Sequence, residues 1–289
     1  MRGVLLMNES MATHNSWRAG GEARRYYRPA DAEDLCDFLA TAPGDEPLLW
    51  CGLGSNLLVR DGGWPGTVIA TLNGLDRLHW MDARTVRVEA GVPCNKLARA
   101  AAKKGLVGAE FLAGIPGTMG GALAMNAGAW GGETWTHAVT VETADRHGRR
   151  RERAVEEFRI GYRDVQGLDG EWFLSGVFQF QPGDAKAAQS RIRHLLAERA
   201  EKQPTGLPSC GSVFRNPPGD HAARLIEACG LKGYRMGGAR VSPKHANFII
   251  NEHQATARDI EALLRHIQAT VHVTFGIALE PEVRIEGRA

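Results

Sequence analysis

Residues 108–133 read GAEFLAGIPGTMGGALAMNAGAWGGE, and glycine recurs throughout this segment. Glycine has no Cβ, so it accepts positive φ angles and lets backbone N–H groups come close to a ligand. Successive N–H groups of this kind form concavities that bind anions. The alternative is a flexible linker, but glycine-rich linkers are polar and rich in serine, whereas this segment carries Phe111, Ile115, Met119 and Trp130. We therefore predict a folded segment that holds a phosphate or pyrophosphate.

A second glycine turn lies at residues 52–59, GLGSNLLV, directly after the apolar run PLLWC. The pattern predicts strand, glycine turn, strand. Leu57 stands where the dinucleotide fingerprint GxGxxG needs its third glycine, and the chain has no GxxxxGK[ST] P-loop. Alone, the turn is explained equally well as a plain connection between strands. The two glycine segments together suggest an extended ligand with several polar centres, such as a dinucleotide bound without a Rossmann unit.

Composition sets the class of protein. The chain has 289 residues, of which 43% are hydrophobic and 24% charged, as in ordinary soluble globular proteins, and this length allows two domains. The formal net charge of +2 is too small to predict a nucleic-acid or membrane partner. The histidines show no HExxH motif and no spacing typical of ligands, so we predict no metal site.

The cysteines and the apolar runs bear on location. Five scattered cysteines without a CxxC pair indicate neither a zinc ribbon nor a redox dithiol, and they suit a reducing compartment. The apolar run near the N-terminus is too short for a signal peptide, and no run is long enough to span a bilayer. We therefore expect a cytoplasmic protein.

Local patterns predict a mixed α+β chain with a domain boundary near Gly183, so that residues 1–183 and 184–289 form separate domains. Strands are expected at 47–51, 57–59, 67–72, 85–92, 172–180, 246–251 and 278–287, with a hairpin over 138–155. Helices are expected at 35–40 with an Asp31 cap, at 97–104 between Pro93 and Gly105, at 185–202, at 221–229 before Gly230, and from about Thr256 onward.

Ser212 is a candidate reactive group in the second domain. It lies in CGSVFRNP, residues 210–217, with Arg215 and Asn216 close behind it, a setting suited to an anionic ligand. The segment is not a nucleophile elbow, because GxSxG is absent. On general grounds, the simpler interpretation is a loop serine that makes a turn hydrogen bond.

Charged residues supply further candidates. Arg163, after Tyr162, could bind a carboxylate bidentately, although a lone arginine more often forms a surface ion pair, here with Asp164 or Glu157.

Near the C-terminus, alternation along the predicted last strand puts Glu280 and Glu282 on one face. Such a pair serves acid–base chemistry or lies on a solvated face. Lys244, in the segment KHANF, is a candidate for polar contacts.

Seven segments in order resemble the UDP-N-acetylenolpyruvoylglucosamine reductase family: NSWRAGG, GLGSNLLV, AGIPGTMGGALAMNAGAWGGE, GYRD, SCGSVFRNP, KHANFIIN and EPEVRIEG. The resemblance extends from Asn15 to Gly287. It implies an FAD-binding domain of the vanillyl-alcohol-oxidase (PCMH) type over residues 1–183. A smaller α+β substrate-binding domain over 184–289 would follow, with a catalytic glutamate on its last strand.

The implied activity is NADPH-dependent reduction of the enolpyruvyl ether of UDP-N-acetylglucosamine to UDP-N-acetylmuramate, for peptidoglycan synthesis, with FAD as cofactor. The implied partner is this small substrate, with no nucleic acid and no membrane. We expect a monomer, although no sequence feature determines the oligomeric state.

The resemblance also implies residue roles. Ser212 matches the proton donor, while Arg163 and Glu282 match the groups that stabilise an enol-like intermediate. Substrate-binding residues would be Tyr162, Arg215, Asn216 and Lys244. Cofactor-binding residues would be Gly52, Gly54, Ser55, Asn56, Leu57, Leu58, Gly114, Ile115, Pro116, Gly117, Gly120, Gly121, Ala122, Asn126, Ala127 and Gly128.

The chain departs from the family pattern in three places. Val165 stands where family members usually have serine, and no long insertion follows the YR motif, which indicates the shorter second type of this family. Residues before Met11 lie outside the pattern, which is typical of a tail or of a start codon placed too early.

Two other functions stay open on the sequence alone. One is a flavin-dependent oxidase on the same fold, although no histidine lies between His79 and His137 to tether a flavin covalently. The other is a nucleotide-sugar binding protein without catalysis, which would not need Ser212, Arg163 and Glu282 together.

Overall fold

The computed structural model describes residues 1–289 and divides into two compact units. Unit 1 comprises Met1–Leu6, Tyr26–Leu53 and Thr67–Glu198, and unit 2 comprises Met7–Arg25, Gly54–Gly66 and Arg199–Ala289. This division differs from a single boundary near Gly183, because two N-terminal segments group with the last third of the chain. The assignment of cofactor and substrate to separate domains stays a prediction.

Several elements contribute residues to both units. They are β1 (Val4–Ser10), β2 (Glu22–Arg28), β5 (Trp64–Ala70) and α4 (Ala185–Lys202). With β3 (Leu48–Cys51), the first three form a sheet in the order β1-β2-β5-β3, in which β3 and β5 run parallel.

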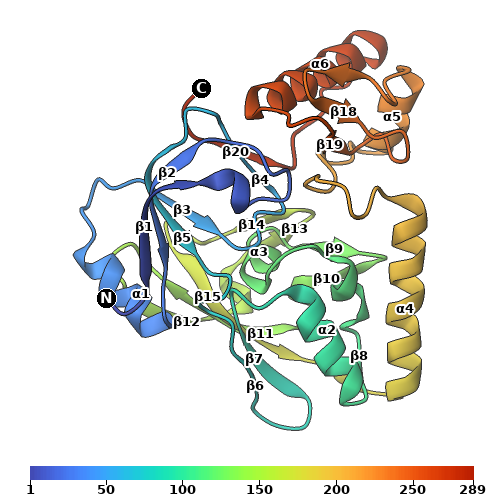
Figure 1. Ribbon diagram of the computed structural model, residues 1–289. Helices are drawn as coiled ribbons and strands as arrows, with labels where there is room; N and C mark the ends of the chain where they lie inside the picture. Colours follow the sequence, from blue (N-terminus) through green and yellow to red (C-terminus); the bar gives the residue numbers. More distant parts are fainter. The chain divides into compact units, whose positions relative to one another are not determined.

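The remaining elements of unit 1 are short and numerous (Figure 1). Its helices are α1 (Ala32–Thr41), α2 (Cys94–Lys103), α3 (Met119–Ala124) and the 3-10 helices η2 (Glu110–Gly114), η3 (Thr134–His137) and η4 (Val155–Glu157). Its strands are β6 (Leu78–Trp80), β7 (Thr85–Glu89), β8 (Leu106–Val107), β9 (Gly128–Ala129), β10 (Gly132–Glu133), β11 (Ala138–Ala144), β12 (Arg150–Ala154), β13 (Arg159–Gly161), β14 (Asp164–Gln166), β15 (Trp172–Gln179) and β16 (Gln181–Pro182).

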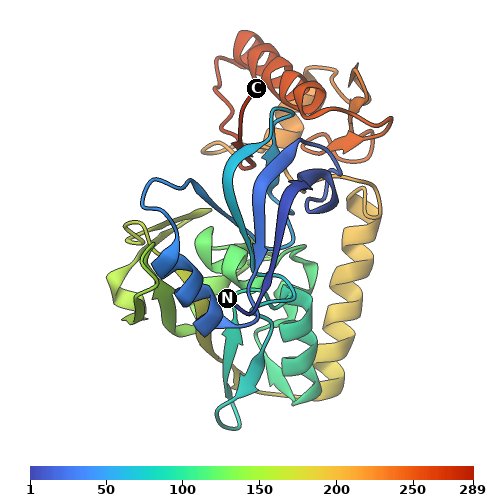
Figure 2. The same cartoon turned by 60° about the vertical axis from the view of Figure 1, so that its left-hand side comes forward.

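A five-stranded antiparallel sheet organises unit 1 in the order β12-β11-β15-β7-β6. β15 lies at its centre and buries six consecutive residues, so its apolar sequence packs on both faces of the sheet. The core also takes in α2 and α3, with Leu97, Met119 and Leu123 fully buried. The β6–β7 hairpin extends beyond the rest of this sheet (Figure 2).

Unit 2 also contains η1 (Met11–Thr13), β4 (Leu57–Val59), α5 (Ala222–Ala228), β17 (Arg235–Met236), β18 (Ala239–Val241), β19 (Ile249–Asn251), α6 (Ala257–Phe275) and β20 (Arg284–Glu286). The strands β17, β18 and β19 form an antiparallel sheet on which α6 packs (Figure 1). β4 and β20 pair in parallel, which ties residues 57–59 to the chain's last strand.

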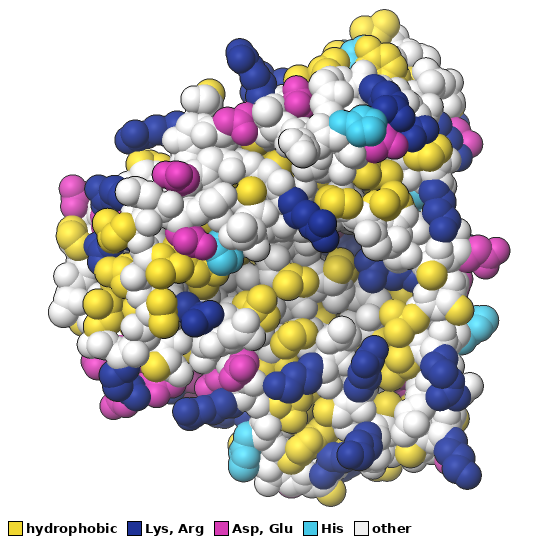
Figure 3. All heavy atoms as spheres, in the orientation of Figure 1, with side chains coloured by type: hydrophobic (Ala, Val, Ile, Leu, Met, Phe, Trp, Pro, Cys, Tyr) yellow, Lys and Arg dark blue, Asp and Glu magenta, His cyan; other side chains and the backbone are white.

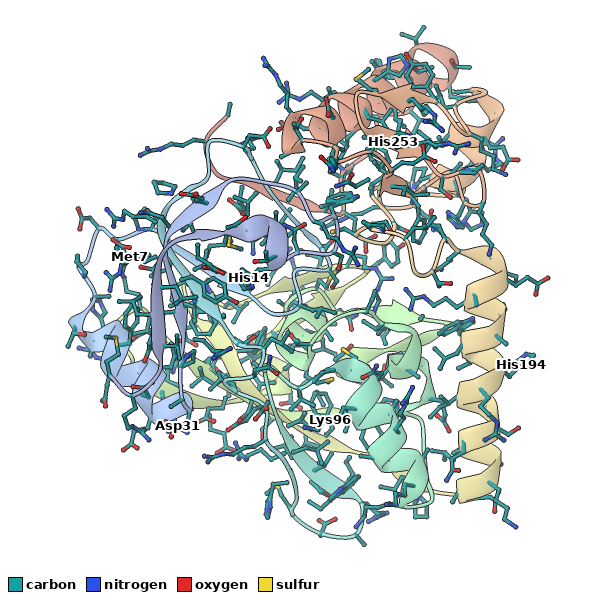
Figure 4. All side chains as sticks on the ribbon, viewed as in Figure 1. Met7, His14, Asp31, Lys96, His194 and His253 are labelled. Carbon is teal, nitrogen blue, oxygen red and sulfur yellow. The ribbon has the colours of Figure 1, made fainter.

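Helix boundaries follow local chemistry. Asp31 caps α1 by accepting a hydrogen bond from Asp34 N–H, and it lies at the start of that helix (Figure 4). Thr256 and Asp259 form a capping box at α6, and Gly276 ends that helix at φ +70°. The predicted helix starts at Asp31 and Thr256, and the predicted helix over 185–202, are confirmed.

Two expectations about the ends of the chain are wrong. The residues before Met11 are not a tail, because β1 is a strand of the four-stranded sheet. The last strand is β20 alone, so Glu280 and Glu282 precede it and do not share a strand face. Pro281, between them, makes only an isolated bridge to Phe214. The Val213 N–H, which could extend this pairing, donates to the Asn247 carbonyl instead.

No helix in the protein combines the length and apolar character needed to cross a bilayer. On the face shown in Figure 3, Lys and Arg side chains are dispersed among neutral and hydrophobic ones rather than gathered in one patch.

The N-terminal residues are held by the buried carboxylate of Asp34, on α1. It accepts hydrogen bonds from the N–H groups of Arg2 and Gly3, from Ala30 N–H and from the Tyr27 hydroxyl. Burial alone would raise the pKa of Asp34, but these hydrogen bonds outweigh it and lower the pKa from 3.8 to about 2. Burial and the same carboxylate raise the pKa of Tyr27.

This network predicts an acid-sensitive contribution to stability. The folded-state pKa of Asp34 lies below the unfolded value, so its contribution of about 2 kcal/mol is complete above roughly pH 4 and is lost as the pH falls toward 2. Asp34→Asn should lower the free energy of unfolding at neutral pH and remove this part of the acid dependence. Urea titrations followed by circular dichroism at several pH values measure both effects. Asp37→Asn, on the exposed side of α1, is the control; equal acid profiles for the two variants would contradict the assignment.

Candidate functional site

The glycine segment of residues 108–133 forms η2, α3 and the β9–β10 hairpin of unit 1. Several of its glycines are required by packing within the protein. A Cβ on Gly114 would lie 2.1 Å from the Trp130 ring, and one on Gly120 would lie 2.7 Å from the Ala90 Cβ. Gly120 N–H also donates to the Ala90 carbonyl at 2.8 Å. These positions therefore have a structural reason for glycine before any ligand is considered.

Gly121 is different, because no protein atom comes near it. A Cβ there would meet only Thr118 Oγ1, at 4.0 Å, and the residue is exposed. Thr118 Oγ1 is itself buried without a hydrogen-bond partner, and a Cβ on Gly52 would lie 2.2 Å from it. The bare backbone at Gly52 and Gly121 thus flanks an unsatisfied hydroxyl, an arrangement suited to a polar ligand group. The neighbouring Ile115 and Pro116 are partly or fully exposed, whereas Ala122 and Ala127 are buried.

The GLGSN turn is held mainly in unit 2. Gly54 has φ +66°, and a Cβ there would lie 2.0 Å from the His14 carbonyl oxygen, so only glycine fits. The Gly54 carbonyl accepts from Ser16 N–H at 3.1 Å and from the buried Cys210 thiol at 3.5 Å. Ser55 and Asn56, which follow, are half-buried.

Arg163 lies in the turn between β13 and β14 of unit 1, with φ +54°. Its guanidinium donates to the carbonyls of Gly128, at 2.8 Å, and Asn126, at 3.3 Å. It also lies 5.4 Å from the centre of the Tyr162 ring, which is 51% exposed. The YR motif is therefore tied to the end of the glycine segment.

Asn126 is the residue that organises this junction. It is buried, and its amide donates to Glu133 and to the Gly161 carbonyl while its Oδ1 accepts from Trp135 N–H at 3.3 Å. Asn126 was predicted to bind the cofactor; in the structure its side chain instead joins three parts of unit 1, and a cofactor contact stays a prediction.

The base of the β13–β14 hairpin is held by Arg153, a buried residue of β12. Arg153 donates to Glu157, which precedes β13, at 3.0 Å and to the Gly167 carbonyl, which follows β14, at 2.8 Å. It also pairs with the buried Glu171 at 3.1 Å. Glu157, one of the two acidic partners considered for Arg163, thus forms an ion pair with Arg153.

Ser212 and Glu282 belong to adjacent segments of unit 2. Glu282 N–H donates to the Val213 carbonyl at 2.8 Å, and Arg215 N–H donates to the Glu280 carbonyl at 2.9 Å. The Asn56 side chain donates to the Glu282 carbonyl at 3.0 Å, and the Asn56 carbonyl accepts from Arg284 N–H at 3.0 Å. The CGSVF loop, the EPEVR segment and the GLGSN turn therefore meet within one unit.

Two predicted substrate-binding residues have structural partners. Asn216 Oδ1 accepts from Ala222 N–H at 3.1 Å, at the start of α5. Lys244 Nζ donates to the Ala200 carbonyl at 2.5 Å, near the end of α4, although the residue is exposed. Next to it, burial lowers the pKa of His245, whose ring packs edge-on against Phe248.

Two residues that the structure singles out, Thr118 and the buried Asn247, were not among the predicted site residues. Both lay inside quoted motifs, but a partnerless hydroxyl or a buried amide has no sequence signature of its own.

No group of three or more His, Cys, Asp or Glu side chains is arranged to hold a metal ion. Three of the histidines lie on separate elements (Figure 4): His14 after η1, His194 in α4 and His253 between β19 and α6. All five cysteines are free thiols.

Comparisons with known proteins identify the class. The family model described as "FAD binding domain" matches residues 23–152, which include every predicted cofactor-binding residue. The protein is thus a flavoprotein with an N-terminal FAD-binding domain. A second family model, "UDP-N-acetylenolpyruvoylglucosamine reductase, C-terminal domain", matches residues 203–286, which include Ser212 and Glu282.

Similar proteins define the family. The UDP-N-acetylenolpyruvoylglucosamine reductase of Alkalilimnicola ehrlichii is 60% identical over 97% of this chain and 94% of its own. That of Methylococcus capsulatus is 57% identical over 100% of this chain and 95% of its own. The crystal structure of the Thermus caldophilus enzyme (MurB) superposes with a TM-score of 0.84 at 33% identity, covering 99% of both chains. The chain belongs to the UDP-N-acetylenolpyruvoylglucosamine reductase family.

This membership confirms the predicted family and the predicted fold class of an FAD-binding domain followed by an α+β region. It also favours the reductase over the oxidase and over the non-catalytic binding protein. The bare backbone at Gly52 and Gly121, and the partnerless Thr118 hydroxyl, fit a bound dinucleotide.

Neighbouring glycines allow a test that separates packing from cofactor binding. Gly121→Ala places a methyl group where the protein leaves space, so the apoprotein should keep its thermal stability while FAD affinity falls about tenfold or more. Gly120→Ala forces a Cβ against Ala90 and should destabilise the apoprotein itself. Fluorescence titration with FAD and thermal melts of the apoproteins measure the two effects. Unchanged FAD affinity in Gly121→Ala would remove Gly121 from the site.

Proposed function

We propose that this protein reduces the enolpyruvyl ether of UDP-N-acetylglucosamine to UDP-N-acetylmuramate with NADPH, using FAD, in peptidoglycan precursor synthesis. Membership of the reductase family supports the reaction. The structural observation that carries it is the hydrogen bond from Glu282 N–H to the Val213 carbonyl, which sets the Ser212 and Glu282 segments side by side.

The proposed catalytic residues divide the chemistry of the reduction. When bound, FAD would supply hydride transfer from NADPH to the terminal vinyl carbon of the substrate. Negative charge then develops at the adjacent carbon and its carboxylate. Arg163 would stabilise this charge by its guanidinium, and Glu282 by a hydrogen bond in its protonated form; fixed groups of this kind contribute roughly 3–4 kcal/mol each.

Ser212 would complete the reaction by donating its hydroxyl proton to the adjacent carbon. A serine hydroxyl is a weak acid, so a neighbouring cation must assist it. The fixed guanidinium of Arg163, held on two carbonyls, supports a role in charge stabilisation rather than in a mobile surface ion pair.

Binding roles are proposed on the same basis. Residues 52, 54–58, 114–117, 120–122 and 126–128 would surround FAD, within the matched FAD-binding region. Tyr162, Arg215, Asn216 and Lys244 would contact the UDP-sugar; the Tyr162 side chain, next to Arg163, is exposed. Cytoplasmic location and a monomeric state remain predictions; the five free cysteines support the former.

Ser212→Ala tests the proton-donor role. The variant should keep its yellow colour and be bleached by NADPH at the wild-type rate, because flavin reduction needs no proton from Ser212. Reoxidation by the enolpyruvyl substrate should slow by about 10²–10⁴-fold. Anaerobic stopped-flow absorbance near the flavin band follows both half-reactions, with Ser209→Ala in the same loop as control. Normal reoxidation in Ser212→Ala would end this assignment.

A further inference from the structure

We infer that Asn247 is a positioning residue for the proposed reaction: it holds the backbone of the Ser212 loop and, through that loop, the segment that carries Glu282. This inference rests on the proposed function for its kinetic consequence, but the contacts that carry it are independent of that function.

Asn247 is 3% exposed and lies before β19. Its carbonyl accepts from Val213 N–H at 2.9 Å, its Oδ1 accepts from Phe214 N–H at 3.1 Å, and its Nδ2 donates to the Phe214 carbonyl at 2.8 Å. One residue therefore satisfies three polar groups of the two residues directly after Ser212.

These three hydrogen bonds fix the loop because they are buried away from water. Val213 and Phe214 are 0% and 1% exposed, so their backbone groups would lose hydrogen bonds without water to replace them. Ser212 itself is only half-buried. Asn247 thus anchors the buried side of the loop and leaves the serine at its accessible edge.

The same anchor extends to Glu282. The Val213 N–H donates to the Asn247 carbonyl, and the Val213 carbonyl accepts from Glu282 N–H at 2.8 Å. The far side of the Glu282 peptide is held by Asn56, which donates to the Glu282 carbonyl at 3.0 Å. The Glu282 segment therefore takes its position from a hydrogen-bonded row that starts at Asn247.

The segment before β19 is held by its own hydrogen bonds. Ser242 Oγ accepts from the N–H groups of Lys244 and His245, at 3.1 and 3.2 Å. Phe248 N–H donates to the His245 carbonyl at 3.1 Å, and Ser242 N–H donates to the Phe248 carbonyl at 2.8 Å. Because of this closed turn, β19 begins only at Ile249, and Asn247 before it lies against the Ser212 loop.

Asn247→Ala is the first test, made on the FAD-loaded enzyme. Misplacement of a reacting group by about 1 Å costs on the order of 10²-fold, so reoxidation of the flavin by substrate should slow by about 10- to 100-fold. Reduction by NADPH should stay within about twofold of wild type. Because Asn247 acts partly through Ser212 and partly through the Glu282 segment, the double variant Asn247→Ala/Ser212→Ala should lose less than the product of the two single-variant losses. Multiplicative losses, or equal slowing of both half-reactions, would overturn the inference.

Asn251→Ala is the matched control. The side chain of this asparagine in β19 also bridges backbone groups, donating to the Trp17 carbonyl and accepting from Ala255 N–H, and forms no hydrogen bond with residues 209–216. Its backbone N–H donates to the Pro208 carbonyl at 2.9 Å, a bond that alanine keeps. It should lower stability while leaving both half-reactions near wild-type rates. The same loss of reoxidation in this control would mean that general destabilisation explains Asn247→Ala.

Asn247→Asp covers the case in which the alanine variant does not fold. The carboxylate keeps the acceptor for Phe214 N–H but faces the Phe214 carbonyl without a donor, whereas the protonated acid donates to it. Burial raises a carboxyl pKa, so reoxidation in this variant should recover, relative to wild type, as the pH is lowered from about 8 to about 6. Ser212→Ala should show no such recovery. A reoxidation rate of Asn247→Asp, relative to wild type, that does not change with pH would contradict the positioning role of Asn247.

Amide hydrogen exchange supplies a readout besides activity. Asn247→Ala or Asn247→Asp should speed exchange in peptides covering 209–216 and 280–286 together, while Asn251→Ala should not. If the wild-type flavin were not reoxidised by the enolpyruvyl substrate, the proposed function would fail, yet the exchange result would still decide whether Asn247 holds both segments. Unchanged hydrogen exchange in either peptide of the Asn247 variants would contradict the inference.

Discussion

The hydrogen bond between Glu282 N–H and the Val213 carbonyl is the contact on which the candidate site depends. It joins a loop near the start of the last third of the chain to the segment just before the final strand. Neither segment belongs to a long helix or strand that would fix it, so their mutual position rests on a few backbone hydrogen bonds. Asn247 on one side and Asn56 on the other hold that row in place. Amide side chains suit this task because each carries both donors and an acceptor and no charge to desolvate.

The same device recurs in unit 1, where Asn126 joins the glycine segment to the turn that carries Arg163. There, the base of the hairpin is fixed by a charged group instead, the buried guanidinium of Arg153. Its ion pairs with Glu157 and Glu171 and its bond to the Gly167 carbonyl satisfy a cation that would otherwise be costly to bury. In both units, side chains without a proposed chemical role fix the backbone next to the proposed catalytic residues.

The glycines of residues 108–133 serve two purposes that the sequence does not separate. Gly114 and Gly120 are glycine because Trp130 and Ala90 occupy the space of a side chain. Gly121 has no such neighbour, and with Gly52 and the buried Thr118 hydroxyl it fits the approach of a dinucleotide. A glycine-rich pattern indicates close approach, but only the coordinates show whether the neighbour is protein or open space.

The sequence by itself determined the elements and the family. Capping residues, apolar periodicity and turn glycines are local signals, so α1, α4, α6 and the β11–β12 hairpin could be predicted from their own residues, and the ordered motifs indicated the reductase family. Tertiary structure alone decided what depends on contacts between distant residues. It made β1 a paired strand rather than a tail, with Arg2 and Gly3 before it held by Asp34. It limited the predicted strand over 278–287 to β20. It also grouped residues 7–25 and 54–66 with the C-terminal third. The roles of Asn126 and Asn247 follow the same rule, because a buried amide acquires its function from partners that the fold brings to it.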